Sequence, residues 1–437
     1  MRPESRPSSI FANRDFSLLF GGSAISAIGD QFTLVALPWL VLKISNDPGA
    51  LGLVLAVMAL PRAAFMLIGG AVVDRLSPRR VLLVSRSVNA AFVALLAVLV
   101  LSGTIQMWML YTIAVGIGLS TAFAYPAGSA ILPQLMKPEH LQAANGLIMG
   151  QRQVSMIVGP VLAGLLIAGG AHAMPGGGPV PEGGAHALAD ARGMGLAFSV
   201  DAVSFLFSLL SLYLIRIHSD THPARPEGGV LSEVMAGLRF IWADVQLRAF
   251  LFYVALVSIF VGGPVQVGLP VLADAHLQHG AASLGILMTT YGVGILLGNL
   301  LSRTGTKLSG GRLGILILSL DAGAGLLLAV LTQAHATWSA SLLLGVMGCF
   351  AGIAQVGVFS WIQQRVPLAM MGRTMSLLFL TFLGLGPIAA AVAGALLKAI
   401  SLTAMFAGAG LTLSAMALFC LTRPTLRRIG VEEPAAT

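Results

Sequence analysis

Long apolar stretches alternate with short polar connections along almost the whole chain. A bilayer core about 30 Å thick is crossed by roughly 20 apolar residues in a helix. Every one of these stretches is long enough, whereas the alternating segments of about ten residues that barrel strands require are not evident. The pattern therefore predicts twelve membrane-spanning helices, at residues 16–42, 50–73, 81–102, 107–129, 145–168, 194–216, 247–272, 283–302, 313–333, 338–361, 374–397 and 400–422.

Two connections are longer than the others. Residues 169–193 are rich in Gly and Pro, and we expect them to form a flexible external loop. Residues 217–246 join two groups of six spans, and their stretch LSEVMAGLRFIW repeats apolar residues at spacings of three and four. That spacing predicts an amphipathic helix on the inner membrane surface. The expected domains are an N-terminal lobe (1–217), a linker (218–246) and a C-terminal lobe with a tail (247–437).

Composition supports a lipid environment. Hydrophobic residues make up 57% of the 437 residues and charged residues only 10%, against about a quarter charged in soluble domains. The formal net charge of +8 must then be interpreted by its position along the chain, and it is no sign of a nucleic-acid partner.

Lys and Arg gather on one side of the predicted spans. Twenty of the 25 fall in the two tails, in the even-numbered connections or at the span ends next to them, three fall on the opposite side, and two lie deeper within spans. Positive charge accumulates on the cytoplasmic face of membrane proteins. We therefore expect both termini in the cytoplasm, in a bacterial-type inner membrane.

The two halves of the chain repeat each other weakly. GAVVDRLSPRR at 70–80 has a counterpart, GNLLSRTGTKL, at 298–308, which is an offset of 228 residues. Gly159-Pro160 has a counterpart in Gly386-Pro387, at an offset of 227. Duplicated six-helix units joined by a cytoplasmic linker are an architecture of secondary transporters, with a binding site near the midplane.

These motifs resemble the major facilitator superfamily. GGAVVDRLSPRR is similar to that superfamily's loop between helices 2 and 3, and SMIVGPVLAG resembles the fifth-helix signature of its exporters. AIGDQFTLVALPWLV, LQAANGL, MMGRTMSL and LRFIWADVQLRAFL resemble its macrolide-efflux and enterobactin-exporter branch. The resemblance implies an all-α integral membrane fold of two pseudo-symmetric six-helix bundles.

The resemblance also implies roles for named residues. In the family, the Asp and Arg of the loop between helices 2 and 3 latch the cytoplasmic ends of the lobes, which would be Asp74 and Arg75 here. The alternative is that these charges only anchor the topology. The implied cytoplasmic gate comprises Gly70, Asp74, Arg75, Arg79 and Arg373, and the implied exporter motif comprises Ser155, Gly159, Pro160 and Gly164.

Five ionisable residues fall well inside predicted spans, away from their cytoplasmic ends, where a charge is costly and therefore a functional candidate. They are Asp30, Arg62, Arg152, Asp201 and Asp321. Asp30 is the candidate for proton coupling, because helix 1 lines the cavity in this family. The alternative is a permanent Asp30–Arg62 ion pair that only joins helices 1 and 2. We expect Asp201 and Asp321 to be structural, and Arg152 to meet either an anionic substrate group or Glu139.

A substrate cavity would include Gln31, Arg152, Gln266 and Gln355. The sequence contains no Walker loop, no nucleophile–base arrangement and no metal-ligand cluster, so we expect no enzyme activity, cofactor or metal. The sequence predicts a monomeric exporter of a bulky amphipathic small molecule (drug, antibiotic or siderophore) in exchange for protons. The alternatives are an uncoupled facilitator or lipid flippase, and a receptor or scaffold that transports nothing.

Overall fold

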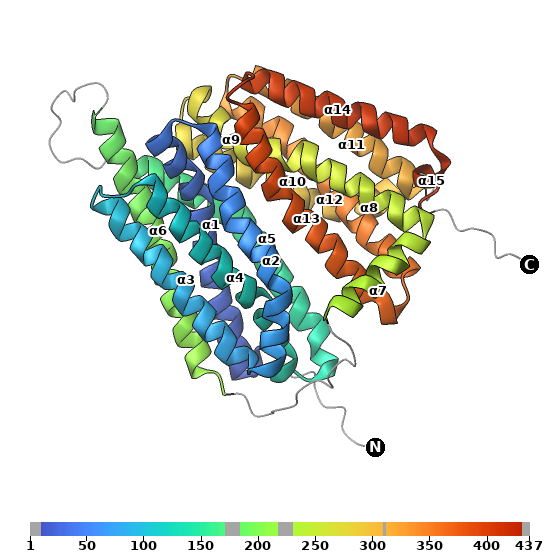
Figure 1. The fold of residues 1–437 in the computed structure, drawn as a ribbon, viewed down its shortest axis with the longest axis horizontal. Coiled ribbons are helices and arrows are strands. Elements are labelled where there is room, and N and C mark those ends of the chain that lie inside the picture. Colours follow the sequence, from blue (N-terminus) through green and yellow to red (C-terminus); the bar gives the residue numbers. More distant parts are fainter. Residues whose placement is uncertain (1–9, 171–183, 217–229, 309–311, 431–437) are drawn as a thin grey trace, which may run out of the picture. The chain divides into compact units, whose positions relative to one another are not determined.

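The computed structural model describes residues 10–170, 184–216, 230–308 and 312–430, and these ranges are helical almost throughout (Figure 1). The helices of the first half are η1 (Ile10–Ala12), α1 (Arg14–Ser45), α2 (Pro48–Arg75), α3 (Pro78–Leu101), α4 (Met107–Leu135), α5 (Pro138–Gly170) and α6 (Gly184–Leu214). The remaining helices are α7 (Val230–Ala243), α8 (Val245–Val257), η2 (Ser258–Gly262), α9 (Gly263–Ala275), α10 (Gly280–Leu308), α11 (Leu313–Val330), η3 (Leu331–Gln333), α12 (Thr337–Arg365), α13 (Leu368–Leu396), α14 (Leu402–Thr422) and α15 (Pro424–Arg427).

The predicted membrane-spanning helices are confirmed. Within the described residues, eleven helices are long and apolar enough to cross a bilayer, and the apolar part of α13, Gly384–Leu396, is a shorter twelfth. The seventh span is a composite, because α8 and α9 are joined through η2, a π-helical turn over Ser258–Gly262. Its next two residues, Gly263 and Pro264, are poor helix formers in a helix interior, which fits a local change of helix type there.

Two elements differ from the sequence-based expectation. Helix α6 begins at Gly184, ten residues before the predicted start of the sixth span, because the Ala- and Leu-containing stretch after the Gly/Pro-rich run favours helix, although the part suited to cross a membrane begins at Ala191. The rest of the predicted loop, residues 171–183, lies outside the described residues. The linker helix α7 forms as predicted, but its side chain Ile241 is buried and α7 packs against α13 and α8.

The chain separates into two compact units. Unit 1 contains residues 1–37 and 61–227, and unit 2 contains residues 38–60 and 228–437. The boundaries inside α1 and α2 fall at Pro38 and Pro61, where proline removes a helix hydrogen bond and allows a bend. The predicted lobes, 1–217 and 247–437, remain a prediction.

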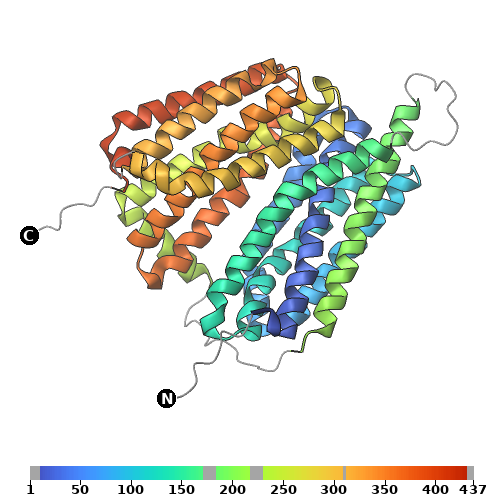
Figure 2. The same ribbon diagram turned by 180° about the vertical axis from the view of Figure 1, so that it is seen from behind.

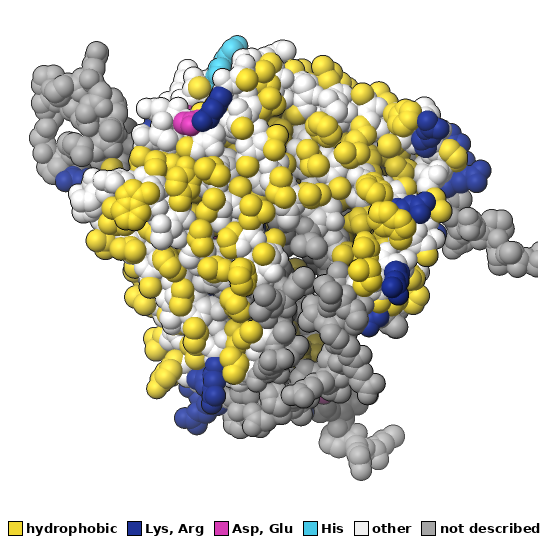
Figure 3. All heavy atoms as spheres, viewed as in Figure 1, with side chains coloured by type: hydrophobic (Ala, Val, Ile, Leu, Met, Phe, Trp, Pro, Cys, Tyr) yellow, Lys and Arg dark blue, Asp and Glu magenta, His cyan; other side chains and the backbone are white. Residues whose placement is uncertain are grey.

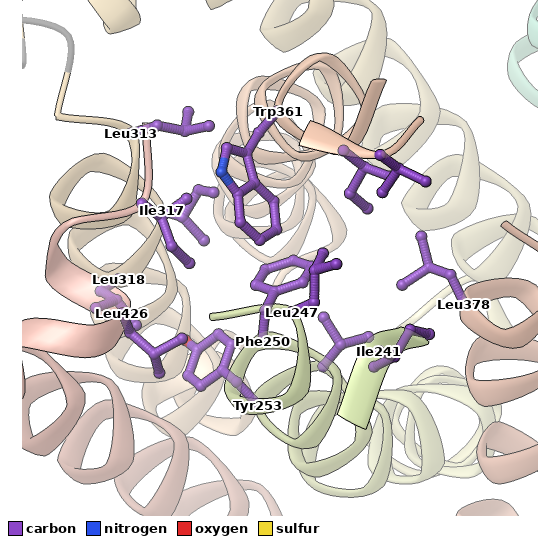
Figure 4. Close-up of a cluster of buried hydrophobic side chains, with 14 residues drawn as sticks. Ile241, Leu247, Phe250, Tyr253, Leu313, Ile317, Leu318, Trp361, Leu378 and Leu426 are labelled. Carbon is purple, nitrogen blue, oxygen red and sulfur yellow. The ribbon is translucent and has the colours of Figure 1, made fainter. Parts of the chain in front are cut away.

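Each unit has its own buried core. In unit 1, Phe16 and Leu82 lie in a cluster to which α1 through α6 contribute side chains. In unit 2, the rings of Phe250 and Trp361 meet edge to face, 5.3 Å apart, and hold α8 against α12 (Figure 4). In a bilayer such side chains hold helices together by close packing rather than by leaving water.

The C-terminal helix α15 closes one end of unit 2. Leu426 and Ile429 enter the core of that unit, and the backbone amide of Gly314 donates to the carbonyl of Ile429 at 2.9 Å. Gly314 has no side chain, which lets the carbonyl of Leu426 pass close to the start of α11. The segment that follows α14 is therefore a packed part of the unit.

Helix pairing repeats between the units. In unit 1 the third and sixth helices, α3 and α6, pack along each other, and in unit 2 the third and sixth spans of that half, α11 and α14, do the same (Figure 2). These pairings support the duplication that the sequence repeats predict.

The visible surface of the helices is largely apolar. Figure 3 shows hydrophobic side chains over most of the described helix surface, with Lys and Arg near helix ends. Exposed Leu300, Trp338 and Tyr213 are typical of a surface in contact with lipid rather than water.

Candidate site: a charged cluster among α1, α3, α5 and α6

Helices α1 and α6 approach each other closely along a seam of small residues in unit 1. A methyl group on Gly29 would collide with Ser204 Oγ and would lie 2.7 Å from Asp201 Oδ1. One on Gly22 would lie 2.7 Å from Ser211 Cβ. The two glycines are seven residues apart, on one side of α1, so together they allow the backbones to pack closely.

Asp30 is the accessible acid of this region. It lies in the middle of α1 and its side chain is exposed, although it is far from either end of the helix. The positive charges of Arg86 on α3 and Arg152 on α5 both interact with Asp30, and the interaction with Arg86 is the stronger of the two. Within the part of the chain that is described, neither arginine forms a salt bridge with Asp30, so the carboxylate is not held in a contact pair.

Asp201 on α6 is the buried acid, with only 1% of its surface exposed. Thr33 Oγ1 on α1 donates to Asp201 Oδ2 at 2.5 Å, and Ser204 Oγ lies 3.3 Å from Oδ1. The Ser204 hydroxyl also donates to the carbonyl of Asp201 at 2.7 Å. The charge that acts on Asp201 is that of Asp30, which is of the same sign.

The arginine beside Asp30 is one that the sequence analysis missed. Arg86 lies six residues after Arg80, near the start of the predicted third span, where the sequence predicts only that it is one of the basic residues on the cytoplasmic side. In the structure it is on α3 and interacts with Asp30. Arg62, the expected partner, is half-buried on α2 and does not figure among the charges that act on Asp30 or Asp201.

The exporter motif of α5 packs against α1. Gly159 and Pro160 are buried, and a side chain on Gly159 would collide with the aliphatic part of Gln31. Ser155 is 2% exposed and its hydroxyl donates to the carbonyl of Gln151 at 3.0 Å. Gly164 is buried one turn further along α5. The absence of a side chain on Gly159 thus leaves room for the Gln31 side chain between α1 and α5.

Unit 2 contains a counterpart of that contact. Gln266 on α9 is exposed, and its amide nitrogen would lie 3.3 Å from a methyl group on Gly386 of α13. In both units, therefore, a glutamine on the first span of the half lies beside the Gly of the Gly-Pro pair on the fifth span. Gln355, the remaining candidate for the substrate cavity, is an exposed side chain on α12.

The gate motif is only partly described. The side chains of Gly70, Asp74 and Arg75 lie outside the described residues. Arg79 donates from Nε to the carbonyl of Leu212 at 2.9 Å and from Nη2 to the carbonyl of Tyr213 at 2.7 Å. A guanidinium there satisfies carbonyls that α6 leaves unpaired and opposes the negative end of its dipole.

Arg373 lies against the linker helix in unit 2. Its Nη1 approaches Met370 Sδ at 3.7 Å, and a methyl group on Gly237 of α7 would lie 3.0 Å from Arg373 Cβ. The side chain thus packs where α7 crosses α13.

Asp321 in unit 2 is hydrogen-bonded between two spans, which fits the structural role expected for it from the sequence. Tyr253 on α8 donates its hydroxyl to Asp321 Oδ2 on α11 at 2.6 Å. Tyr253 is 4% exposed, so this bond joins two spans inside the unit. Among the described residues there is no group of three or more His, Cys, Asp or Glu side chains that could hold a metal ion.

The family of the chain follows from comparison with known protein families. The model for the Major Facilitator Superfamily matches residues 19–391. The chain belongs to the major facilitator superfamily. It is a multi-pass membrane protein and a transporter, not an enzyme, and a small-molecule substrate follows from the family.

Similar proteins in this superfamily include exporters. The chain is 26% identical over 436 residues to the multidrug efflux pump Tap of Mycolicibacterium fortuitum, covering 94% of this chain and 96% of that protein. It is 22% identical over 358 residues to the enterobactin exporter EntS of Escherichia coli O1:K1 / APEC, covering 82% and 79%.

Solved structures share the fold at low sequence identity. The nucleoside transporter NupG matches with a TM-score of 0.69 at 12% identity, covering 96% of this chain and all of that one. A bacterial homologue of the iron transporter ferroportin, in an inward-facing state, matches with a TM-score of 0.69 at 17% identity, covering 95% and 100%.

Proposed function

We propose that the chain is a secondary exporter that moves a bulky amphipathic small molecule out of a bacterial cell in exchange for protons. The observation that carries the proposal is Asp30, an accessible carboxylate in the middle of a span, with two arginines that act on it without forming a contact pair. The resemblance to Tap and EntS supports export of a drug, an antibiotic or a siderophore.

The chemistry of the exchange follows from the cost of charge in a membrane. An ionised Asp30 balances part of the positive charge of Arg86 and Arg152, and a protonated Asp30 leaves that positive charge in excess. A substrate that presents a positive charge or a hydrogen-bond donor to Asp30 interacts with the ionised carboxylate and favours loss of its proton. Substrate and proton thereby compete, which is what antiport requires.

The cytoplasmic gate is a further part of the proposal. Asp74 and Arg75, with Gly70, Arg79 and Arg373, latch the cytoplasmic ends of the lobes in one conformation of the transport cycle. The anchoring of α6 by Arg79 supports this role, because it gives the loop between α2 and α3 a fixed position in unit 1. The proposed protein acts as a monomer in the plasma membrane, with both termini in the cytoplasm.

Export is tested in a drug-sensitive bacterial host that lacks its own major efflux pumps. The probes are ethidium, a macrolide and a catecholate siderophore, because these match the chemistry named for the relatives. Cells that express the chain should accumulate less of at least one probe than cells with Asp30→Asn at equal expression. A protonophore should remove the difference. Unchanged accumulation of all three probes would contradict export, and a difference that survives the protonophore would contradict proton coupling.

A further inference from the structure

The proposed function leaves the second carboxylate of the cluster unused. Asp201 is more deeply buried than Asp30, yet among the described residues the charge that acts on it is that of Asp30, a neighbour of the same sign. A buried ionised carboxylate whose neighbouring charge is also negative is costly in a membrane. A group in that position lowers its cost by binding a proton.

The packing of α6 on α1 brings Asp201 close to Asp30. Asp201 Oδ1 lies 2.7 Å from where a methyl group on Gly29, the residue that precedes Asp30, would be, and Asp201 Oδ2 accepts from Thr33, one turn after Asp30. Residues three apart on a helix are surface neighbours, roughly 5–6 Å between Cβ atoms. Gly29 and Thr33 both lie on the face of α1 next to that of Asp30, so the Asp201 carboxyl group contacts this neighbouring face, and it does so because Gly29 has no side chain.

The surrounding charges divide the roles of the two acids. Arg86 of α3 and Arg152 of α5 both act on Asp30, whereas the groups that bind Asp201 are the hydroxyls of Thr33 and Ser204. Arg62 of α2 is not among the charges that act on either acid. Asp30, Asp201, Arg86 and Arg152 together carry no net charge when both acids are ionised. They carry one positive charge when the two acids hold one proton.

We infer that Asp201 is the second proton-binding group of the site, so that Asp30 and Asp201 share one proton across the seam between α1 and α6. This inference rests on the proposed proton antiport and adds a partner to Asp30. Asp30 is the accessible member that exchanges the proton with water, and Asp201 is the buried member that holds it. In the exchange one carboxyl O–H bond breaks as another forms, and no electrons are transferred.

The inference makes the two acids titrate as a pair rather than singly. Interacting groups bind protons in steps that belong to the pair, so removal of either member changes the step of the other. A purely structural Asp201 would accept the Thr33 hydrogen bond whether or not it binds a proton, and an Asn there would do the same.

The test is an equilibrium proton titration of the full chain in lipid nanodiscs without substrate. Proton uptake on acidification is compared among the native protein, Asp30→Asn, Asp201→Asn and the double variant. Asp321 in unit 2 contributes equally to all four. Ser208→Ala is the matched control, because Ser208 is buried about two turns after Asp201 on α6 and its hydroxyl has no hydrogen-bond partner within the described residues.

Asp201→Asn should lose about one proton of uptake per chain, because it removes one of the two carboxyl groups that share the proton. Asp30→Asn should shift the pH at which Asp201 binds its proton by about one pH unit or more, as expected for interacting acids. Thr33→Val keeps both acids. It should change the pH at which the pair binds its proton without changing the number of protons bound, so it serves as a second test if Asp201→Asn folds poorly. Ser208→Ala should coincide with the native protein.

Two results would overturn the inference. One is an Asp201→Asn curve that coincides with the native curve, and the other is an Asp30→Asn curve in which the remaining step has not moved. The titration does not depend on transport, so its failure is distinct from that of the proposed function. Proton-driven export with an unchanged Asp201→Asn titration would refute only the shared proton, whereas a shared proton without gradient-driven export would refute only the antiport.

Discussion

Tyr253 is the hydrogen-bond partner of Asp321, a half-buried acid on α11. Its hydroxyl is 2.6 Å from Asp321 Oδ2, and it belongs to the core cluster that contains Phe250 and Trp361. Loss of a hydrogen bond to a partly buried carboxyl group costs about 1–3 kcal/mol.

Tyr253→Phe should therefore lower the thermal unfolding midpoint of the purified protein by several degrees. The measurement is thermal unfolding in detergent, and Tyr213→Phe is the control, because Tyr213 is 72% exposed. The role assigned to this hydrogen bond would be wrong if the two variants were equally stable.

Asp244 links the start of α8 to the end of α12. It caps α8 by accepting from the amides of Gln246 and Leu247, and Arg365 Nε donates to its Oδ2 at 2.6 Å. Partial burial by itself raises the pKa of Asp244, but the Arg365 hydrogen bond and the two amides outweigh it and hold the pKa below its usual range.

A lowered pKa means that Asp244 stabilises the fold in its ionised form. The contribution is fully present above the unfolded pKa of about 3.9 and is lost as the pH falls through the lower folded pKa. Arg365→Gln should lower the unfolding midpoint by a few degrees at most at neutral pH. The gap to the native protein should close in strong acid, and a gap that is constant with pH would contradict this account.

The sequence identified most of the ionisable residues in the spans but few of their partners. Asp30, Asp201 and Asp321 stand out because charges are rare in apolar stretches. Arg86 did not, since its position near a helix start allowed a topological role, and only the packing of α3 shows that it acts on Asp30. The Thr33–Asp201 bond joins residues 168 apart, and no local pattern indicates such a bond.

At the scale of elements, the seam between α1 and α6 determines where the two acids meet. Gly29 is in contact with α6 at Ser204 and Asp201, whereas Gly21 on the same helix has open space where a side chain would be.

This difference predicts that a Gly→Ala substitution is harmful at one of these positions and harmless at the other. Gly29→Ala should push α1 away from α6 and lower both the unfolding midpoint and export, because the clash involves a packed helix face. Gly21→Ala should leave both unchanged. Thermal unfolding and probe accumulation, measured side by side, check the pair, and equal behaviour of the two variants would argue against a close seam.

Element types were predictable from hydropathy alone, and local detail was not. The spans and the linker helix follow from apolar length and from the spacing of Leu238 and Ile241. The π-helical turn at Ser258–Gly262 does not, because its formation depends on packing against α13, where Gly263 meets Ala389. The face that α7 presents to α13 is a tertiary feature of the same kind.

At the scale of the whole molecule, the distribution of Lys and Arg is the basis for orientation. The 20-to-3 bias predicts that reporter fusions after residues 46 and 335 report the outside. Fusions after residues 78, 225 and 430 should report the cytoplasm. An outside signal at 225 would contradict two groups of six spans joined by a cytoplasmic linker.

The account depends most on the claim that export is coupled to protons through Asp30. The most direct test is transport in proteoliposomes of purified protein with an imposed pH gradient, using the probe that the cells export. The native protein should accumulate the probe against its gradient on the acidic side. Asp30→Asn should only equilibrate the probe, and Ser208→Ala should match the native protein. Uphill accumulation by Asp30→Asn, or equal transport with and without the pH gradient, would contradict the account.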